Sequence, residues 1–570
     1  RELPSRQGRV RPLWGTMSAL VPPPILQLTG RGDLGKVLCR IMTTLAYHSM
    51  HTYAEKVVKM GRKILFVTSD EQRYDGLGCY GGRIARTPNL DRLAAAGIRY
   101  ERAYAQNVTC MPARSTIITG QHVDTHGVYR NGYSLPEDDP CVARLLRDQG
   151  HYRTALIGKA HWQPMTDHGS WEASAALRGD HGPYRGFEYL SLAAHSGIAY
   201  RCTLHYNRWL AENGAQYIDG FYPPVGPNNG PNNLKGGDTD AIQVHFNPCP
   251  REFYHTDWVA DRSIDWLRTL GQEDDWFLWV SFPDPHHPFD PPVAEKGRVN
   301  WRDLDLPAGH PGSREKIEHV LASKPKHWLN FFLGKADVAE ETPDGFVPST
   351  LTDDNVREIN AMVHIQNELI DEALGRILAY IRDRGWDDDV DIIYTTDHGT
   401  TQGDFGLMFK GPFHVDGLMR LPMIWRPAPS AGIPGGQVIH DPVGQVDLAP
   451  TFARIAGLPL PSWIEGRELP VTADPSRDAV LCQWDASKAG LEIQMRSIYD
   501  RSGFVCTSYK KTNYYQGTEG ELYHLGDDPR QWVNLWDDPG YAQVRQELLE
   551  KIARMQRSPR NPPLQRRSRT

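Results

Sequence analysis

The feature that most constrains the fold is a pair of short apolar runs, each of which leads into an aspartate. The run from Lys63 to Ser69 ends at Asp70, and the run from Val390 to Tyr394 leads to Asp397. Short, continuously apolar runs rich in β-branched residues are typical of strands buried on both faces of a parallel sheet. Functional residues of such sheets gather beyond the carboxyl ends of the strands, so both acids are candidate site residues.

Helices and strands are predicted to alternate through the central part of the chain. The segment Pro88–Gly97 opens with Pro and closes with Gly, as helices often do. A second helix is predicted from Val142 to Gly150, followed by a strand at 154–157, and a long amphipathic helix from Asp353 to Arg384. This alternation favours a parallel sheet covered by helices, which makes the chain an α/β protein.

The character of the sequence changes near residue 475. Short aromatic and β-branched runs at 497–499, 504–508 and 521–525 predict a small antiparallel sheet, closed by a helix at 542–555. We therefore expect a disordered leader at 1–61, a catalytic α/β domain at 62–474, a smaller C-terminal domain at 475–556 and a basic tail at 557–570. The segment 223–237, which is rich in Pro, Asn and Gly, is predicted to be a surface loop.

The net charge of −7 is unevenly distributed along the chain. Ten Lys and Arg face three acids in residues 1–62, and residues 557–570 hold five Arg and no acid, which leaves about −19 on the middle. The acidic middle argues against a nucleic-acid partner, and the basic ends are expected to be solvated tails.

Eight cysteines are scattered without a short repeating spacing, which indicates free thiols and no zinc site of the Cys-x-x-Cys kind. No apolar run has the length of a membrane helix, and no convincing signal peptide is present. We expect a cytoplasmic protein without a membrane partner, and an oligomer is compatible with the sequence.

The motif that carries the chemistry is Cys110-x-Pro112-x-Arg114, followed by a segment that ends at Gly120. For an arbitrary cysteine, a buried structural thiol is the better interpretation. Here the segment from Cys110 to Gly120 resembles the signature of the formylglycine-dependent sulfatases, in which this cysteine is oxidised to an aldehyde. The rest of residues 62–556 resembles that family in the same order, at Asp70, Thr87–Asp91, Gly158–His161, Pro285–Pro288, Asp397–Gly399, Lys410, Arg420–Pro422, Gly520–Tyr523, Asp528–Pro529 and Asn534–Leu535.

The resemblance implies an alkaline phosphatase-like α/β/α sandwich and one divalent metal ion. Because the esters cleaved by this family are anionic, attack on them requires positive charge around the transferred group. The implied metal ligands are Asp70, Glu71, Cys110 as formylglycine, Asp397 and His398. Three roles stay open for Glu71: it binds the metal directly, it binds the metal through a water molecule, or it only adjusts the surroundings of the other ligands. We expect Ca²⁺ first, with Mn²⁺ and Mg²⁺ as alternatives.

The resemblance also implies roles for five further side chains. Hydrated formylglycine attacks the ester, the anion stays attached, and the second hydroxyl then expels sulfate. Arg114 is expected to orient the hydrated formylglycine. Lys159 and Lys410 are expected to bind the non-bridging oxygens of the substrate. His161 would take a proton from the second hydroxyl. His286 would donate a proton or a hydrogen bond to the leaving oxygen.

One further residue, Asn131, resembles a substrate-facing asparagine of some family members, although an Asn-Gly turn explains it equally well. We expect His287 to be a wall residue of the site. Trp162, Trp171, Tyr184 and Trp301 are expected in the core rather than in a substrate pocket.

The function expected from the resemblance is hydrolysis of a small anionic sulfuric ester, after maturation by a formylglycine-generating enzyme. A phosphonate monoester or phosphodiester hydrolase with the same nucleophile is the alternative. A non-catalytic, anion-binding relative ranks third, because all the expected charged positions are filled. Substrate specificity is expected to lie in loops such as 163–250 and 290–350.

Overall fold

The computed structural model describes residues 62–165, 167, 169–194, 204–218, 235–343 and 345–567. The predictions for the leader at 1–61 and for the last three residues of the basic tail lie outside this part of the chain. The same holds for the predicted loop at 223–237, of which only 235–237 are described.

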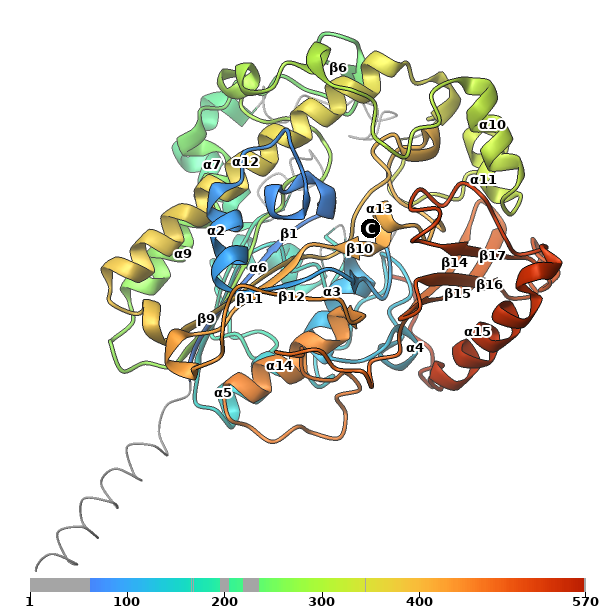
Figure 1. The fold of residues 1–570 in the computed structure, drawn as a ribbon. Coiled ribbons are helices and arrows are strands. Elements are labelled where there is room, and N and C mark those ends of the chain that lie inside the picture. Colours follow the sequence, from blue (N-terminus) through green and yellow to red (C-terminus); the bar gives the residue numbers. More distant parts are fainter. Residues whose placement is uncertain are drawn as a thin grey trace, which may run out of the picture. The chain divides into compact units, whose positions relative to one another are not determined.

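The centre of the fold is a twisted mixed sheet (Figure 1). It has eight strands, with β1 between β9 and β8. Its order is β12 (Gln437–Ile439), β2 (Ile98–Tyr100), β11 (Met423–Arg426), β9 (Val390–Thr396), β1 (Lys63–Ser69), β8 (Trp276–Ser281), β4 (Arg153–Gly158) and β5 (Tyr189–Leu192). The strands from β9 to β5 are parallel, as predicted. The strand β11, which sequence analysis did not predict, runs antiparallel to both β9 and β2.

The direction of β11 follows from the path of the chain before it. A parallel neighbour of β9 would require a long crossover, usually a helix. Between β9 and β11 the chain instead stays beyond the carboxyl end of β9, where it forms a 3-10 helix (Asp404–Gly406) and the short helix α13 (Asp416–Met419). It then returns along the sheet in the opposite direction.

Helices cover both faces of the sheet. Leu65 and Val67 of β1 pack in one apolar cluster with α2 (Pro88–Ala96), α9 (His255–Arg268) and α12 (Asp353–Asp383). On the opposite face, Ile64 and Phe66 pack with α3 (Cys110–Thr119), α5 (Val142–Asp148) and α14 (Leu448–Ile455). This alternation along β1 is what a strand buried on both faces requires. The predicted α/β/α arrangement is confirmed.

The predicted helices α2, α5 and α12 and the strands β1, β4 and β9 all form within a few residues of their expected ends. A capping box at Thr352 and Asn355 opens α12. The remaining elements are α4 (Val123–His126), α6 (Trp171–Arg178), α7 (His205–Asn213), α10 (Arg314–Ala322), α11 (His327–Phe332), β3 (Ala103–Tyr104), β6 (Lys235–Gly236), β7 (Ala241–Ile242), β10 (Arg420–Leu421) and β13 (Val443–Gly444).

The C-terminal part contains the predicted small antiparallel sheet. Its strands are β14 (Ala479–Lys488), β15 (Leu491–Asp500), β16 (Phe504–Tyr509) and β17 (Gly520–His524), in sequential order. One face packs on α15 (Ala542–Met555), through Leu548 and Ile552 of the helix (Figure 1). Sequence analysis did not predict β14. Residues 61–570 form a single compact unit, so the boundary at 474/475 stays a prediction.

The first residues of the basic tail are held against the fold. Arg560 forms an ion pair of 2.6 Å with Asp139, and its backbone N–H donates to the carbonyl of Asp124. Further along, the N–H of Arg567 donates to the carbonyl of Gly132 at 2.8 Å. The side chains of residues 561–567 are largely exposed, as expected of a solvated tail, but the backbone is fixed at these points.

Among the residues that the structure describes, no helix has both the length and the apolar character that crossing a bilayer requires. The aromatic side chains expected in the core lie there. Trp162, Tyr184 and Trp301 are buried, and Trp171 packs against the core from a partly buried position.

Candidate active site

The ends of two adjacent parallel strands place the first two acids together. In the register of β1 and β9, Ser69 pairs with Thr396, so Asp70 and Asp397 follow side by side. The backbone N–H groups of Glu71 and His398 both donate to Oδ1 of Asp397, at 3.0 and 2.9 Å. These bonds fix the Asp397 carboxylate at the edge of the sheet, and both aspartates are fully buried.

Cys110 lies at the first position of α3, a helix whose residues are all buried. Pro112 is tolerated there because N–H groups in the first turn have no intrahelical partner. Gly120 ends the helix in the left-handed conformation, at φ +65°. The Sγ atom lies 3.2 Å from Nε2 of His398 and 3.7 Å from Oδ1 of Asp70. Burial raises the pKa of the thiol well above its usual value, and the neighbouring Asp70 raises it further.

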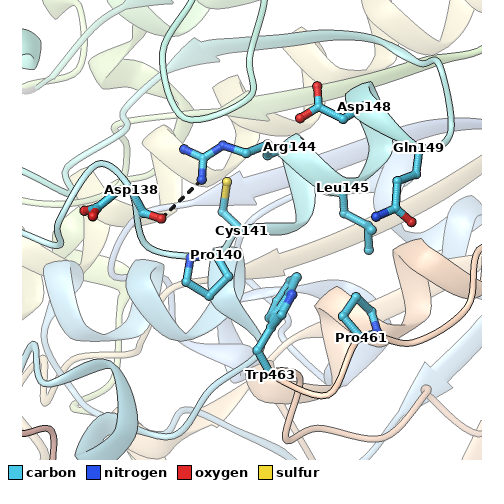
Figure 2. A pocket seen from close by; sticks show the side chains of 9 residues that line it. All are labelled: Asp138, Pro140, Cys141, Arg144, Leu145, Asp148, Gln149, Pro461 and Trp463. Atoms are coloured by element: carbon cyan, nitrogen blue, oxygen red, sulfur yellow. Dashed lines mark hydrogen bonds between the residues drawn. The ribbon is translucent and has the colours of Figure 1, made fainter.

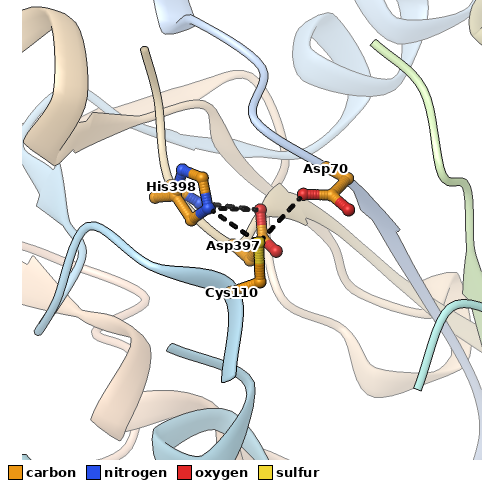
Figure 3. Close-up of side chains that lie close together, drawn as sticks. All are labelled: Asp70, Cys110, Asp397 and His398. Atoms are coloured by element: carbon orange, nitrogen blue, oxygen red, sulfur yellow. Dashed lines mark hydrogen bonds and ion pairs between the residues drawn. The ribbon is translucent and has the colours of Figure 1, made fainter. Parts of the chain in front are cut away.

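Asp70, Cys110, Asp397 and His398 form a compact group that points toward one centre (Figure 3). One ligand atom from each of the four lies within 4.8 Å of the others. Two carboxylates, an imidazole and the side chain of residue 110 form a donor set suited to a divalent cation such as Ca²⁺ or Mn²⁺. The residues present therefore fit the metal that the sequence implies.

Arg114 joins the acids from one turn further along α3. Its Nε donates to Oδ2 of Asp397 at 2.9 Å, and its Nη1 donates to the carbonyl of Lys159 at 2.7 Å and to Ser281 at 2.9 Å. Its Nη2 lies 3.8 Å from Asp70. Although burial opposes its charge, the two aspartates raise the pKa of Arg114 above its usual value, so the side chain stays cationic.

Two lysines approach the sulfur of Cys110. Lys159, just after β4, forms an ion pair with Asp70, and its Nζ lies 3.7 Å from Sγ. Lys410 lies 3.4 Å from Sγ and contacts Glu71 at 3.0 Å. Burial works against both charges, but the neighbouring acidic groups raise the pKa of each lysine. Both side chains are therefore positioned to attract an anion to residue 110.

The two predicted catalytic histidines lie on loops after β8 and β4. Nε2 of His286 is 3.0 Å from Nζ of Lys410. His161 is buried and has φ +60°, an uncommon conformation for a residue with a side chain. Burial, and then the charge of Lys159, hold the pKa of His161 well below its usual value. Its Nδ1 makes no hydrogen bond within the described residues.

The side chain of Glu71 lies apart from the four-residue group. It contacts Lys410 at 3.0 Å, Nε2 of His286 at 3.3 Å and Nδ1 of His287 at 3.6 Å. Although burial raises the pKa of Glu71, the charges of Lys410 and His286 lower it overall, so the carboxylate is ionised. In this arrangement Glu71 holds Lys410 and the histidine pair in place, and its role as a metal ligand stays a prediction.

Asn131 is fully buried and does not point into open space. Its carbonyl accepts from the backbone N–H of Met111 at 3.0 Å, and its amide donates to Glu341 at 2.5 Å. Sequence analysis missed Glu341. Its Oε2 lies 2.6 Å from Lys410 and 3.0 Å from Nε2 of His286. The only signal for it was its place in the loop 290–350, which was expected to carry specificity.

The charges of this site do not balance without a cation. Four carboxylates, from Asp70, Glu71, Glu341 and Asp397, face three permanently charged bases. Those bases are Arg114, Lys159 and Lys410. A bound divalent cation would turn this excess of one negative charge into an excess of one positive charge, which a singly charged anion bound at the site would balance.

A separate cavity of about 330 Å³ lies beside α5, between Pro140, Cys141, Arg144 and Trp463 (Figure 2). Arg144 donates to the carbonyl of Asp138 across its rim at 3.4 Å. None of the predicted site residues lines this cavity. Its walls bring together no group of metal-ligating or nucleophilic side chains, so we place the site at the ends of β1 and β9.

Comparison with known proteins gives consistent matches. A family model described as Sulfatase matches residues 62–458, and one described as N-sulphoglucosamine sulphohydrolase, C-terminal, matches residues 403–558. The sulfatase YidJ of Escherichia coli K12 is 26% identical, with 86% of each chain covered. The N-acetylglucosamine-6-O-sulfatase of Bacteroides thetaiotaomicron is 24% identical, with 87% of this chain and 86% of that protein covered. The solved phosphonate monoester hydrolase of Agrobacterium radiobacter has a TM-score of 0.69 at 25% identity, over 86% of this chain and 95% of that one.

Proposed function

The chain belongs to the sulfatase family, and on that premise we propose that it hydrolyses a small sulfuric ester with a formylglycine made from Cys110. One observation carries the proposal. The sulfur of residue 110 lies within 3.7 Å of Asp70, His398, Lys159 and Lys410. In the mature protein, hydroxyl groups of hydrated formylglycine would occupy the region of this sulfur, between the metal ligands and the two lysines.

Asp70, Asp397 and His398 would hold the divalent metal, together with residue 110. When bound, the metal would supply positive charge that makes a hydroxyl on residue 110 easier to deprotonate. We propose Ca²⁺ because the carboxylate oxygens are hard ligands, and the imidazole keeps Mn²⁺ as an alternative. Arg114 binds Asp397 through Nε and turns Nη2 toward Asp70, so it orients both carboxylates around that hydroxyl.

Lys159 and Lys410 would bind the non-bridging oxygens of the ester. Both ammonium groups lie within 3.7 Å of the sulfur of residue 110, and both are buried, where electrostatic attraction is stronger than in water. They bring the anionic ester to the nucleophile and stabilise the charge that develops on the transferred group.

The two histidines differ in surroundings in a way that matches their proposed roles. His161 is held neutral by burial and by Lys159, and its Nδ1 makes no hydrogen bond within the described residues. It is therefore suited to take a proton from the second hydroxyl. His286 lies within 3.3 Å of Lys410, Glu71 and Glu341, and we propose that it donates a proton to the leaving oxygen.

A phosphonate monoester or phosphodiester hydrolase is the second candidate. It is favoured by the similarity to the solved phosphonate monoester hydrolase. Sulfate monoesters, phosphonate monoesters and phosphodiesters each carry one negative charge at the transferred group, so the same bases could bind all three. The non-catalytic alternative is disfavoured because every expected charged position is filled and lies at the site.

The decisive experiment uses protein with a verified aldehyde at residue 110. Steady-state kcat/KM would be measured on matched aryl sulfate, aryl phosphonate and aryl phosphodiester substrates, with Ca²⁺, Mn²⁺ or Mg²⁺. We expect the sulfate to be preferred. Turnover of the phosphonate faster by orders of magnitude would establish the second candidate instead, and no turnover of any substrate would support the non-catalytic one.

Maturation requires a partner enzyme that converts Cys110 to formylglycine. The carbon framework of the residue is kept, so the aldehyde would weigh roughly 18 Da less than the thiol. We keep the cytoplasm as the proposed compartment, because the six cysteines that the structure describes are all free thiols.

A further inference from the structure

Glu341 places a carboxylate among the groups that would bind the substrate anion. Its Oε2 contacts Lys410 at 2.6 Å and Nε2 of His286 at 3.0 Å. One ligand atom from each of Cys110, His286 and Glu341 lies within 4.8 Å of the others. An anion bound at residue 110 therefore meets this carboxylate at close range and competes with it for Lys410 and His286.

The residues on both sides of Glu341 are held in place by contacts with distant segments. The N–H of Glu340 donates to the carbonyl of Lys410 at 2.8 Å, and the Glu340 side chain forms a buried ion pair of 2.6 Å with Arg130. On the other side, Lys488 donates to Thr342 at 3.1 Å. Glu341 itself has φ +55°, a conformation that costs free energy and is found where the surroundings enforce it.

The side chain is fixed as well, and it is charged. The amide of Asn131 donates to Oε1 at 2.5 Å, while the carbonyl of Asn131 is bound by the N–H of Met111, next to the nucleophile. Burial favours the neutral acid, but Lys410 and His286 outweigh it and hold the pKa of Glu341 well below its usual value. A negative charge thus stands at a defined place beside the anion site.

We propose that Glu341 sets the charge preference of the site, by admitting singly charged esters and disfavouring doubly charged oxyanions. The proposal rests on the function proposed above and adds the class of substrate charge to it. A sulfuric ester carries one negative charge, whereas the inorganic sulfate that it yields carries two. The same carboxylate therefore discriminates between substrate and product and promotes release of the product.

The physical reason is that electrostatic repulsion grows in proportion to the charge of the ligand. At the few ångströms separating Glu341 from residue 110, one added unit charge is disfavoured by about fourfold at the dielectric constant of water and by roughly several hundredfold at an effective dielectric constant of 20. Lys410 and His286 reduce this effect but do not cancel it, because Glu71 already engages both. We therefore expect a preference of about tenfold for each added charge.

The test compares two tetrahedral oxyanions of similar size. Inorganic sulfate is a dianion, and methanesulfonate is a monoanion of similar shape. Their dissociation constants would be measured by calorimetry on the metal-loaded, aldehyde-containing protein, and their inhibition constants with an aryl sulfate substrate. In Glu341→Gln, we expect sulfate binding to tighten about tenfold more than methanesulfonate binding, with correspondingly stronger product inhibition. Equal changes for the two ions, or weaker binding of both, would overturn the proposal.

Two further variants keep the test decisive. Glu315→Gln removes the same charge at an exposed position on α10, which is not among the residues of the site, and should leave both constants unchanged. Glu341→Ala removes the carboxylate without a new amide and should shift selectivity in the same direction, even if Glu341→Gln is unstable. Because binding is measured directly, an enzyme that hydrolyses no sulfuric ester but shows the charge preference would contradict only the proposed function.

Discussion

The Nζ of Lys410 lies 3.4 Å from the Sγ of Cys110, although 300 residues separate the two in the chain. The same ammonium group contacts Glu71 at 3.0 Å and Glu341 at 2.6 Å. Lys410 thus connects the nucleophile to the carboxylates of Glu71 and Glu341. Loss of Lys410 should therefore affect both the binding of the anion and the stability of the fold.

Lys410→Met should lower kcat/KM for an aryl sulfate by about 10²- to 10³-fold, because one positive charge at the transferred group is lost. The buried carboxylates Glu71 and Glu341 would then lack a partner, so the melting temperature should fall as well. Lys410→Arg keeps the charge and should restore much of the stability but less of the activity. An unchanged kcat/KM in Lys410→Met, measured on folded protein, would refute its role at the transferred group.

Cys110→Ala should abolish turnover, to below about 10⁻³ of the parent kcat, because no aldehyde can form. The variant should fold, since the side chain that replaces the thiol is smaller and apolar. In the native fold, unconverted Cys110 should resist alkylation and should react after Cys79, the only cysteine among the six described that is not buried. Peptide mass spectrometry of protein alkylated before and after unfolding measures the reactivity of Cys110 and of Cys79. Rapid alkylation of Cys110 in folded protein would contradict its burial.

Removal of the metal should lower both activity and stability. Without the cation, the four carboxylates of the site outnumber its permanently charged bases, and a ligand bound only by the folded state stabilises it by mass action. Chelation should therefore reduce the melting temperature by several degrees, and re-addition of Ca²⁺ or Mn²⁺ should restore it. Asp397→Asn should remove most of this metal-dependent shift, whereas Glu315→Gln should preserve it.

Glu172 should make part of the stability depend on pH. Burial raises the pKa of its carboxyl to about 7, although Arg185 lowers it. Because the folded pKa exceeds the unfolded value of 4.5, this group's contribution is fully present below pH 4.5 and is lost as the pH rises through 7. The loss is at most about 3 kcal/mol in the free energy of unfolding.

Denaturant unfolding of the parent and of Glu172→Gln between pH 5 and pH 8 measures this contribution. The variant cannot ionise at position 172, so its pH dependence should be shallower in that window. The exposed substitution Glu315→Gln serves as the matched control and should follow the parent. Parallel profiles for the parent and Glu172→Gln would show that Glu172 is already ionised in the folded protein.

The ends of β1 and β9 could be predicted because two local signals coincide there. A continuous apolar run marks a buried strand, and an acid directly after it marks the carboxyl edge of the sheet. Neither signal depends on distant residues, so Asp70 and Asp397 were found from sequence. The family pattern then located Cys110, Lys159, His286 and the remaining predicted site residues on the same edge.

What sequence analysis missed depends on tertiary context. The direction of β11 is set by the connection above β9, which has no periodic signature. The strand β14 mixes polar and apolar residues, such as Gln483 and Trp484, without a clean alternation. Glu341 lies in a loop where its neighbours Glu340 and Thr342, rather than a helix or strand, fix its place. Such positions are defined by contacts between distant segments, which a single sequence does not contain.

The burial of Cys110 also limits the time during which its thiol can be converted to the aldehyde. His398, which contacts its sulfur, lies 288 residues later, so at roughly 5–20 residues per second Cys110 is made about 15 to 60 s before His398. Until β9 is added beside β1, the sheet edge that encloses the cysteine is incomplete. A converting enzyme would thus meet an accessible thiol only while the polypeptide is still growing or has just been released, and faster translation should lower the fraction of molecules that carry the aldehyde.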